Sequence, residues 1–261
     1  MQNLVHPKEK TYYRVALVFS LIVYGIALLL LLSSFASGRG AIVGITVVLA
    51  VAFYAFLAWA ILTMAQGYFV ARVRRDAVRI GERQFAEVYA IVKSMAAEMG
   101  LKKVPAVYLL QAGGALNAFA TKFLSRDFVV VYSDVFELAY EQGEDALRFI
   151  IGHELGHLHR KHLRGRWKIL PGFLIPFLAM AYFRACEYTC DRYGKAFGRP
   201  SGSQGLLILG AGKALCGKVD EEELMKQTED EKEFFMWLAE INASHPNLAR
   251  RIKNFREFAV S

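Results

Sequence analysis

The residues best suited to chemistry in this chain stand close together, in the stretch HELGH at 153–157. This stretch lies within 144–161, a segment that the spacing of its apolar residues predicts as a helix. Because residues four apart on a helix share a face, His153 and His157 project toward a common point and can bind one zinc ion. Glu154 is turned away from that pair but can reach an attacking water, which makes it the candidate general base of a hydrolysis.

The alternative for these residues is simple packing on a helix that happens to match the pattern. Two histidines and a glutamate among apolar neighbours would be costly to bury without partners, so a metal site is favoured. Gly156 points the same way, because a glycine inside a helix costs about 1 kcal/mol relative to alanine. Close approach by another segment is the expected compensation.

A catalytic zinc site takes three protein ligands and keeps one position open. The other side chains that could serve are His159, His162, Glu187, Asp191 and His245. His159 and His162 are expected at the polar, basic end of the histidine helix. Glu187 and Asp191 lie one helical turn apart, so Glu187 is predicted as the third ligand of a single zinc ion per chain. Asp191 would accept a hydrogen bond from a ligand histidine. The alternative for Glu187 and Asp191 is that both lie on an ordinary solvated, charged face of the helix.

Two long apolar runs precede the histidine helix. Residues 15–36 and 41–65 contain no charged side chain, and each exceeds the roughly 20 residues that a helix needs to cross a bilayer. We therefore expect a membrane anchor over 1–70 with two transmembrane helices, followed by a second domain over 71–261. A cleavable signal peptide is the alternative for the first run, but the run is longer than a signal-peptide core and the second run would still anchor the chain.

Composition and charge agree with a chain that lies partly in lipid. The chain has 261 residues, 55% of them hydrophobic, a mean hydropathy of +0.28 and a formal net charge of +8. Basic residues flank the two runs on their outer sides, with only Arg39 between them, so both termini and the second domain are expected in the cytoplasm of a bacterial-type cell membrane. This topology accounts for the basic excess, and no nucleic-acid partner is expected. The three cysteines, Cys186, Cys190 and Cys216, are expected as free, buried thiols.

The remaining pattern predicts an α+β, mainly helical fold in which the membrane hairpin precedes a zincin-like domain with a small sheet. A long helix is expected from 64 to 100. Three short strands, antiparallel or mixed, are expected at 107–110, 117–121 and 128–132. The apolar segment 169–183 is short for a membrane span and contains two prolines, which favours a re-entrant, interfacial or buried connection.

Four separate motifs then follow the order of one family: LNAFA at 116–120, HExxH at 153–157, ExxxD at 187–191, and SHP at 244–246 with Arg251 after it. Together with the hydrophobic hairpin, they resemble the HtpX-like and CAAX-prenyl-protease family of membrane zinc metallopeptidases, which are gluzincins. The resemblance covers about 84–258. This likeness implies a zinc metallopeptidase domain over 71–261.

The resemblance also implies roles for residues outside the metal ligands. His245 would lie at the cleft and help to bind substrate or stabilise the oxyanion, and Arg251 would tie the C-terminal helix to the site. Without the family, His245 before a proline would be a surface residue at the start of a helix. The substrate backbone would add as an extra strand to an edge strand that contains Asn117, Ala118, Phe119 and Ala120.

The expected function is therefore that of a membrane-anchored zinc metalloendopeptidase acting on protein or peptide substrates. By the same resemblance it would work in the quality control of membrane or misfolded proteins. The HtpX branch usually carries further membrane helices between HExxH and the glutamate, and the prenyl-protease branch carries many more spans, so prenylated substrates are not expected. The alternatives are a catalytically degenerate membrane scaffold or regulator that retains a zinc site, and a non-proteolytic zinc hydrolase.

Overall fold

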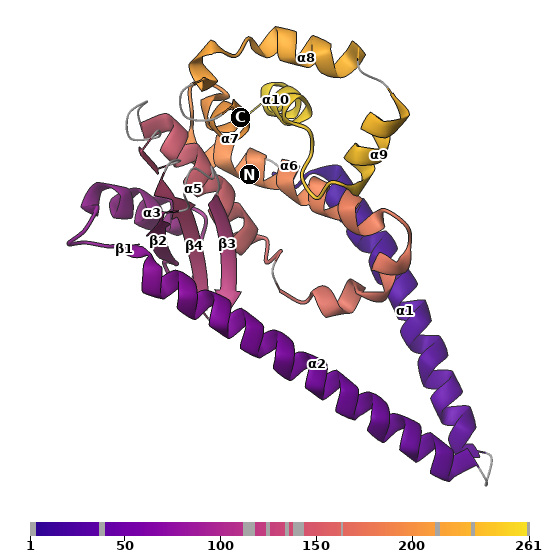
Figure 1. The fold of residues 1–261 in the computed structure, drawn as a ribbon. Helices are drawn as coiled ribbons and strands as arrows, with labels where there is room; N and C mark the ends of the chain where they lie inside the picture. Colours follow the sequence, from indigo (N-terminus) through magenta and orange to yellow (C-terminus); the bar gives the residue numbers. More distant parts are fainter. Residues whose placement is uncertain are drawn as a thin grey trace.

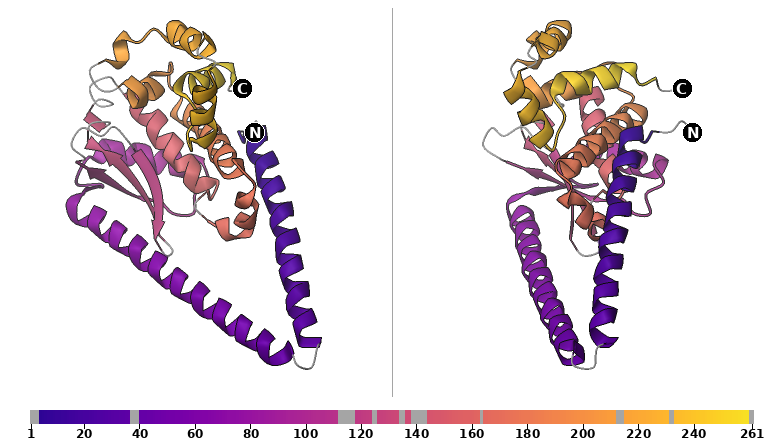
Figure 2. Two further views of the ribbon diagram at one scale, coloured as in Figure 1. Left: turned by 45° about the vertical axis from the view of Figure 1, so that its right-hand side comes forward. Right: turned by 90° about the vertical axis from the view of Figure 1, so that its right-hand side faces the viewer.

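Two long apolar helices open the chain and meet at one end, as Figure 1 shows. They are α1 (Pro7–Ala36) and α2 (Gly40–Asp76), and they diverge from their connection toward the rest of the molecule in all views (Figures 1 and 2). The structure, a computed structural model, describes residues 4–36, 40–111, 118–123, 126–133, 136–137, 144–162, 164–211, 215–230 and 233–259.

Both helices are long and apolar enough to cross a membrane by length and composition. With 30 and 37 residues, they extend about 45 and about 55 Å at about 1.5 Å per residue, well beyond the roughly 30 Å of a hydrocarbon core. Their large apolar side chains are mostly exposed, with Ile42 at 77% and Leu62 at 69%. A continuous apolar surface of this size is unusual on a protein that is surrounded only by water.

A four-stranded mixed sheet follows α2. The strands are β1 (Val78–Ile80), β2 (Ala106–Leu110), β3 (Ala118–Phe123) and β4 (Arg126–Tyr132), in the order β1-β2-β4-β3. β2 and β4 are parallel, whereas β1 on β2 and β3 on β4 are antiparallel. The prediction of a small mixed sheet is confirmed for the three later strands, and β1 was not predicted.

The predicted single helix over 64–100 is wrong in its middle. α2 ends at Asp76, β1 pairs with β2, and α3 (Ala86–Glu98) begins after a turn in which Gly81 and Gln84 bridge. The apolar residues of this region satisfy a strand as well as a helix, and Ile80 is buried in the main core. Residues 78–80 form a strand because they pair with β2, which lies more than twenty residues further along the chain. Local hydrophobic periodicity cannot predict such a pairing.

Helices make up the remainder of the chain, and most of them lie beyond the sheet from α2 (Figure 1). They are α5 (Glu144–His159), the short 3-10 turns η1 (Arg166–Ile169) and η2 (Pro171–Leu174), α6 (Leu178–Gly198), α7 (Gln204–Ala211), η3 (Cys216–Lys218), α8 (Glu221–Asp230), α9 (Phe234–Asn242) and α10 (Leu248–Glu257).

Glycines let α5 and α6 approach each other closely. A Cβ atom added at Gly156 would lie 3.0 Å from Tyr193 Cβ and 3.4 Å from Cys190 Cα. A Cβ atom at Gly194 would lie 2.8 Å from the Phe149 carbonyl oxygen. The close approach expected at Gly156 is thus present, and it sets the ExxxD segment of α6 against the histidine face of α5.

The apolar segment 169–183 runs through η2 into α6 and packs against α1. Ala16 is buried there, and the Gly172 N–H donates to Ser20 Oγ at 2.8 Å. Other apolar side chains of the segment face outward, with Leu174 75% exposed. Because one side is buried on α1 and the other is open, the segment is a packed connection with an exposed apolar side.

Candidate metal centre and active site

The two histidines of the HELGH stretch project from α5 toward a carboxylate on α6. Glu187 Oε2 lies 3.3 Å from His153 Nε2, and Glu187 Oε1 lies 3.4 Å from His157 Nε2. His153 and Glu187 are buried, and His157 is mostly so. Two imidazole nitrogens and one carboxylate, converging from two helices, match the donor types of a catalytic zinc site.

A second layer of contacts fixes this arrangement from behind. Asp191 is one turn after Glu187, and its Oδ1 lies 3.0 Å from His153 Nδ1. Arg251 of α10 donates to both Asp191 oxygens, from Nη2 at 2.6 Å and from Nε at 3.0 Å. Asp191 is only 1% exposed, which rules out a solvated charged face for the ExxxD pair.

Electrostatics in the metal-free protein follow from these contacts. Burial alone would raise the pKa of Glu187, but the adjacent His157 and His153 hold the pKa of that carboxyl well below its usual range. Burial likewise opposes ionisation of Asp191, yet Arg251 and the bond from His153 lower its pKa. For His153, hydrogen bonds to Asp191 and Glu187 outweigh burial and raise its pKa to about 10. A proton and a metal therefore compete for His153.

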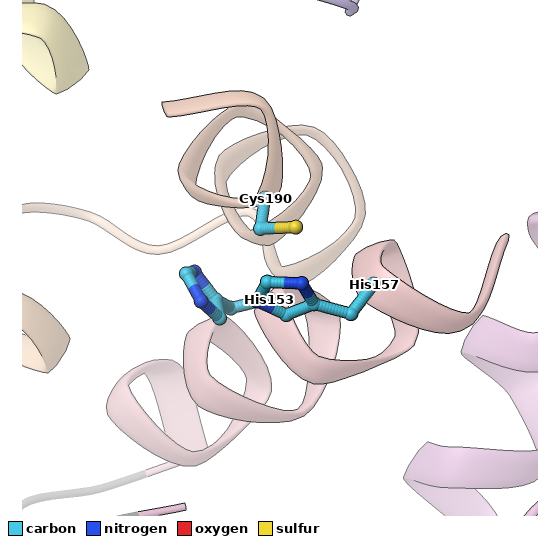
Figure 3. Close-up of side chains that lie close together, drawn as sticks. All are labelled: His153, His157 and Cys190. Atoms are coloured by element: carbon cyan, nitrogen blue, oxygen red, sulfur yellow. The ribbon is translucent and has the colours of Figure 1, made fainter. Parts of the chain in front are cut away.

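Cys190 of α6 lies beside the histidines, as Figure 3 shows. One ring nitrogen of His153, one of His157 and the Cys190 sulfur are all within 4.8 Å of one another. Either Glu187 or Cys190 could therefore supply the third donor beside the two histidines. Burial raises the pKa of the Cys190 thiol well above its ordinary value, whereas Glu187 is anionic and faces the Nε2 atoms of both histidines. The position of Glu187 against both Nε2 atoms favours it as the third donor.

The structure places the other predicted site residues as follows. Glu154 is buried on α5. His245 lies in the loop between α9 and α10, largely exposed, with Nε2 3.6 Å from Glu187 Oε1. Asn117 lies outside the described residues, and Ala118, Phe119 and Ala120 begin β3, an edge strand of the sheet against which α5 packs.

His162 does not lie at a solvated helix end, as the sequence suggested. After α5, Lys161 adopts a left-handed conformation with φ of 59°, and the chain turns back so that the His162 N–H donates to the His157 carbonyl at 3.1 Å. The His162 ring is then buried, with Nδ1 3.1 Å from His157 Nδ1. His159 remains half-buried at the helix end, its ring 5.3 Å from that of Tyr193.

Sequence reasoning also missed Glu9, which α1 inserts beneath the same site. Glu9 is buried, and its Oε1 lies 3.3 Å from His162 Nε2. Arg160 donates to the same oxygen at 2.8 Å. No local signal could have paired a residue of the predicted anchor with one about 150 positions later.

Comparisons with known proteins agree with this geometry. Residues 82–172, which include α5 and both histidines, match peptidase family M48. A solved structure described as the crystal structure of S. mikatae Ste24p shares the fold with a TM-score of 0.52 at 15% identity, over 94% of this chain and 66% of that chain. The chain thus spans just under two thirds of that protein's length. Among curated proteins, none matches. The chain thus carries a segment that matches peptidase family M48, and it shares its fold with Ste24p.

Proposed function

We propose that this protein is a membrane-anchored zinc metalloendopeptidase in which His153, His157 and Glu187 hold one zinc ion. The observation that carries the proposal is the placement of Glu187 against the Nε2 atoms of both histidines, at 3.3 and 3.4 Å. Asp191 and Arg251 behind them supply the outer support that ligand histidines generally need. When bound, the zinc ion supplies a Lewis acid that activates water near neutral pH.

The chain's own residues perform the remaining chemistry. Glu154, next to the ligand His153, takes a proton from the attacking water and passes it to the leaving amine. Asp191 holds His153 in the tautomer whose Nε2 carries a lone pair. His245, near Glu187 at the mouth of the site, is placed to bind substrate or to donate to the oxyanion.

Protein or peptide segments are the proposed substrates. β3 lies at the sheet edge beside α5, and an extended chain can pair with such an edge by main-chain hydrogen bonds. The family resemblance supports a role in the quality control of membrane or misfolded proteins. A degenerate scaffold is disfavoured because the base, both histidines, the glutamate and the aspartate are all present.

The bilayer is the proposed environment of α1 and α2. Their exposed apolar side chains and their length fit two membrane crossings, and the basic flanks favour cytoplasmic termini and a cytoplasmic catalytic domain. We propose a bacterial-type cell membrane as the location. Proteolysis of inverted vesicles should degrade the catalytic domain, and its protection there would overturn this topology.

The decisive experiment compares zinc content and peptide hydrolysis in single variants of the detergent-solubilised protein. Glu154→Gln should keep one zinc per chain and lose hydrolysis, because it removes the base and no ligand. Glu187→Ala should lose zinc. His159→Gln, a histidine of the same helix outside the site, is the matched control and should change neither property.

Two results would contradict the assignment. Hydrolysis retained by Glu154→Gln would remove Glu154 from the role of base. Full zinc content in Glu187→Ala together with zinc loss in Cys190→Ser would show that the thiol, and not the carboxylate, completes the ligand set. A wild-type protein that binds no zinc would refute the proposed function as a whole.

A further inference from the structure

A continuous line of polar contacts leads from the metal centre to the first turn of α1. His157 Nδ1 lies 3.1 Å from His162 Nδ1, and His162 Nε2 lies 3.3 Å from Glu9 Oε1. Arg160 closes the line by donating to Glu9 Oε1 from Nη2 at 2.8 Å and from Nε at 3.3 Å. His162 and Glu9 are 4% and 3% exposed, so water does not compete for these contacts.

The order of the contacts fixes where the protons are. His157 Nε2 faces Glu187 and must present a lone pair to bind a metal, so its proton sits on Nδ1. His157 Nδ1–H then donates to His162 Nδ1, which leaves the proton of His162 on Nε2. That nitrogen lies 3.3 Å from Glu9 Oε1, within ion-pair distance of the carboxylate.

The two ligand histidines are thus supported in parallel ways. Behind His153 stands Asp191, which is neutralised by Arg251. Behind His157 stands Glu9, which acts through His162 and is neutralised by Arg160. The first carboxylate comes from the catalytic domain, whereas the second comes from the anchor.

We infer that Glu9 is a positioning residue of the metal centre, supplied by the anchor helix and acting on His157 through His162. The inference rests on the proposed function, because it takes His157 as a ligand. Two further contacts hold this end of the chain in place: the His6 N–H donates to Thr189 Oγ1 at 3.0 Å, and the His6 ring stacks on Tyr188 at 5.1 Å. Docking of α1 and formation of a high-affinity zinc site are therefore linked.

A second metal ion is the competing explanation for this cluster, because donor atoms of Glu9, His162 and Cys186 also lie within 4.8 Å of one another. The Arg160 guanidinium already supplies the positive charge that Glu9 requires, and a cation added beside it would be repelled. A hydrogen-bonded support therefore explains the cluster better than a second metal.

The test is the zinc dissociation constant of the full-length protein in detergent, measured by chelator competition. Loss of an outer hydrogen-bond partner typically weakens metal binding about 10- to 100-fold. We expect Glu9→Gln and His162→Gln each to weaken binding by about 10-fold or more. The double variant should bind zinc as His162→Gln does, because Glu9 acts only through His162. Glu9→Asp keeps the charge that Arg160 needs but is about 1.5 Å too short, so it should weaken binding even if Glu9→Gln folds poorly.

Ser20→Ala is the matched control, since it removes another bond between α1 and the catalytic domain, to Gly172, without touching the line. It should leave the zinc dissociation constant unchanged. The inference is overturned if zinc binding is unaffected in Glu9→Gln, Glu9→Asp and His162→Gln, or if the two losses multiply in the double variant. Two zinc ions per wild-type chain, falling to one in Glu9→Gln, would also overturn it. A wild-type protein without zinc would instead refute the proposed function.

Discussion

Gly194→Ala is the sharpest test of how α6 positions the proposed ligand Glu187. The new Cβ would lie 2.8 Å from the Phe149 carbonyl oxygen and 2.9 Å from Phe149 Cδ2. Ordinary Cβ contacts begin at 3.4 Å, so α6 must retreat from α5 by about 3.4 − 2.8 = 0.6 Å at this point. Asp191 lies one turn before Gly194, and Glu187 lies two turns before it.

The displacement should matter more for the metal than for stability. Overpacking costs typically about 1–3 kcal/mol, but alanine gains about 1 kcal/mol over glycine in a helix, so the net loss should be about 0–2 kcal/mol. Metal–ligand distances tolerate only about 0.2 Å, so a shift of 0.6 Å should weaken zinc binding at least about 10-fold. Chelator competition and thermal unfolding of the same samples measure the two effects separately.

Gly25→Ala is the control for the alanine itself. Gly25 lies inside α1, and nothing stands within 4 Å of an added Cβ. It should leave zinc binding and hydrolysis unchanged. If Gly194→Ala also bound zinc as tightly as the wild type, the reasoning that glycine contact sets the ligand geometry would be refuted.

Three further outcomes are expected. Asp191→Asn should lower the free energy of unfolding by about 3–5 kcal/mol, measured with denaturant, because buried Arg251 would keep only the more distant Glu187, at 3.9 Å, as a counter-charge. A change below about 1 kcal/mol would contradict a buried ion pair. In the metal-free protein the raised pKa of His153 contributes stability that is complete below pH 6.5 and is lost as the pH rises through about 10. The thermal unfolding midpoint, measured at one constant denaturant concentration, should therefore fall over that pH window. A flat profile would contradict protonated His153. Trp167 is exposed beside η2. Once the other two tryptophans are replaced by phenylalanine, brominated lipids should quench the fluorescence of Trp167. No quenching would place η1 and η2 away from the bilayer.

Sequence reasoning succeeded where the determinants are local. Histidines four apart on one helix must share a face, and the short apolar runs at 107–110 and 128–132 formed strands. The apolar runs became α1 and α2 for the same reason. In each case hydrophobic period and length decide the structure, and both can be read from a window of the chain.

It failed where distant segments decide. β1 exists because β2 lies beside it, and the predicted helix over 64–100 was broken by that pairing. His162 was assigned to a polar end because its neighbours are basic, but the left-handed Lys161 turns it inward. Cys190 is a free, buried thiol as expected, but its proximity to both histidines appears only once α6 packs on α5. Such contacts depend on tertiary packing, which no single segment encodes.

If the chain cleaves proteins as proposed, the edge position of β3 bears on which of them it could cleave. Within the described part of the sheet, β3 pairs only with β4 and spans six residues, Ala118–Phe123. A strand can add there only if it has already left its own fold, because its backbone groups must be free to pair. Cleavage of a folded protein would then follow the fraction of time its segment spends open, and each 1.4 kcal/mol of local stability would slow it about tenfold. Selection of damaged proteins would need no recognition sequence, because loss of local stability would itself be the signal.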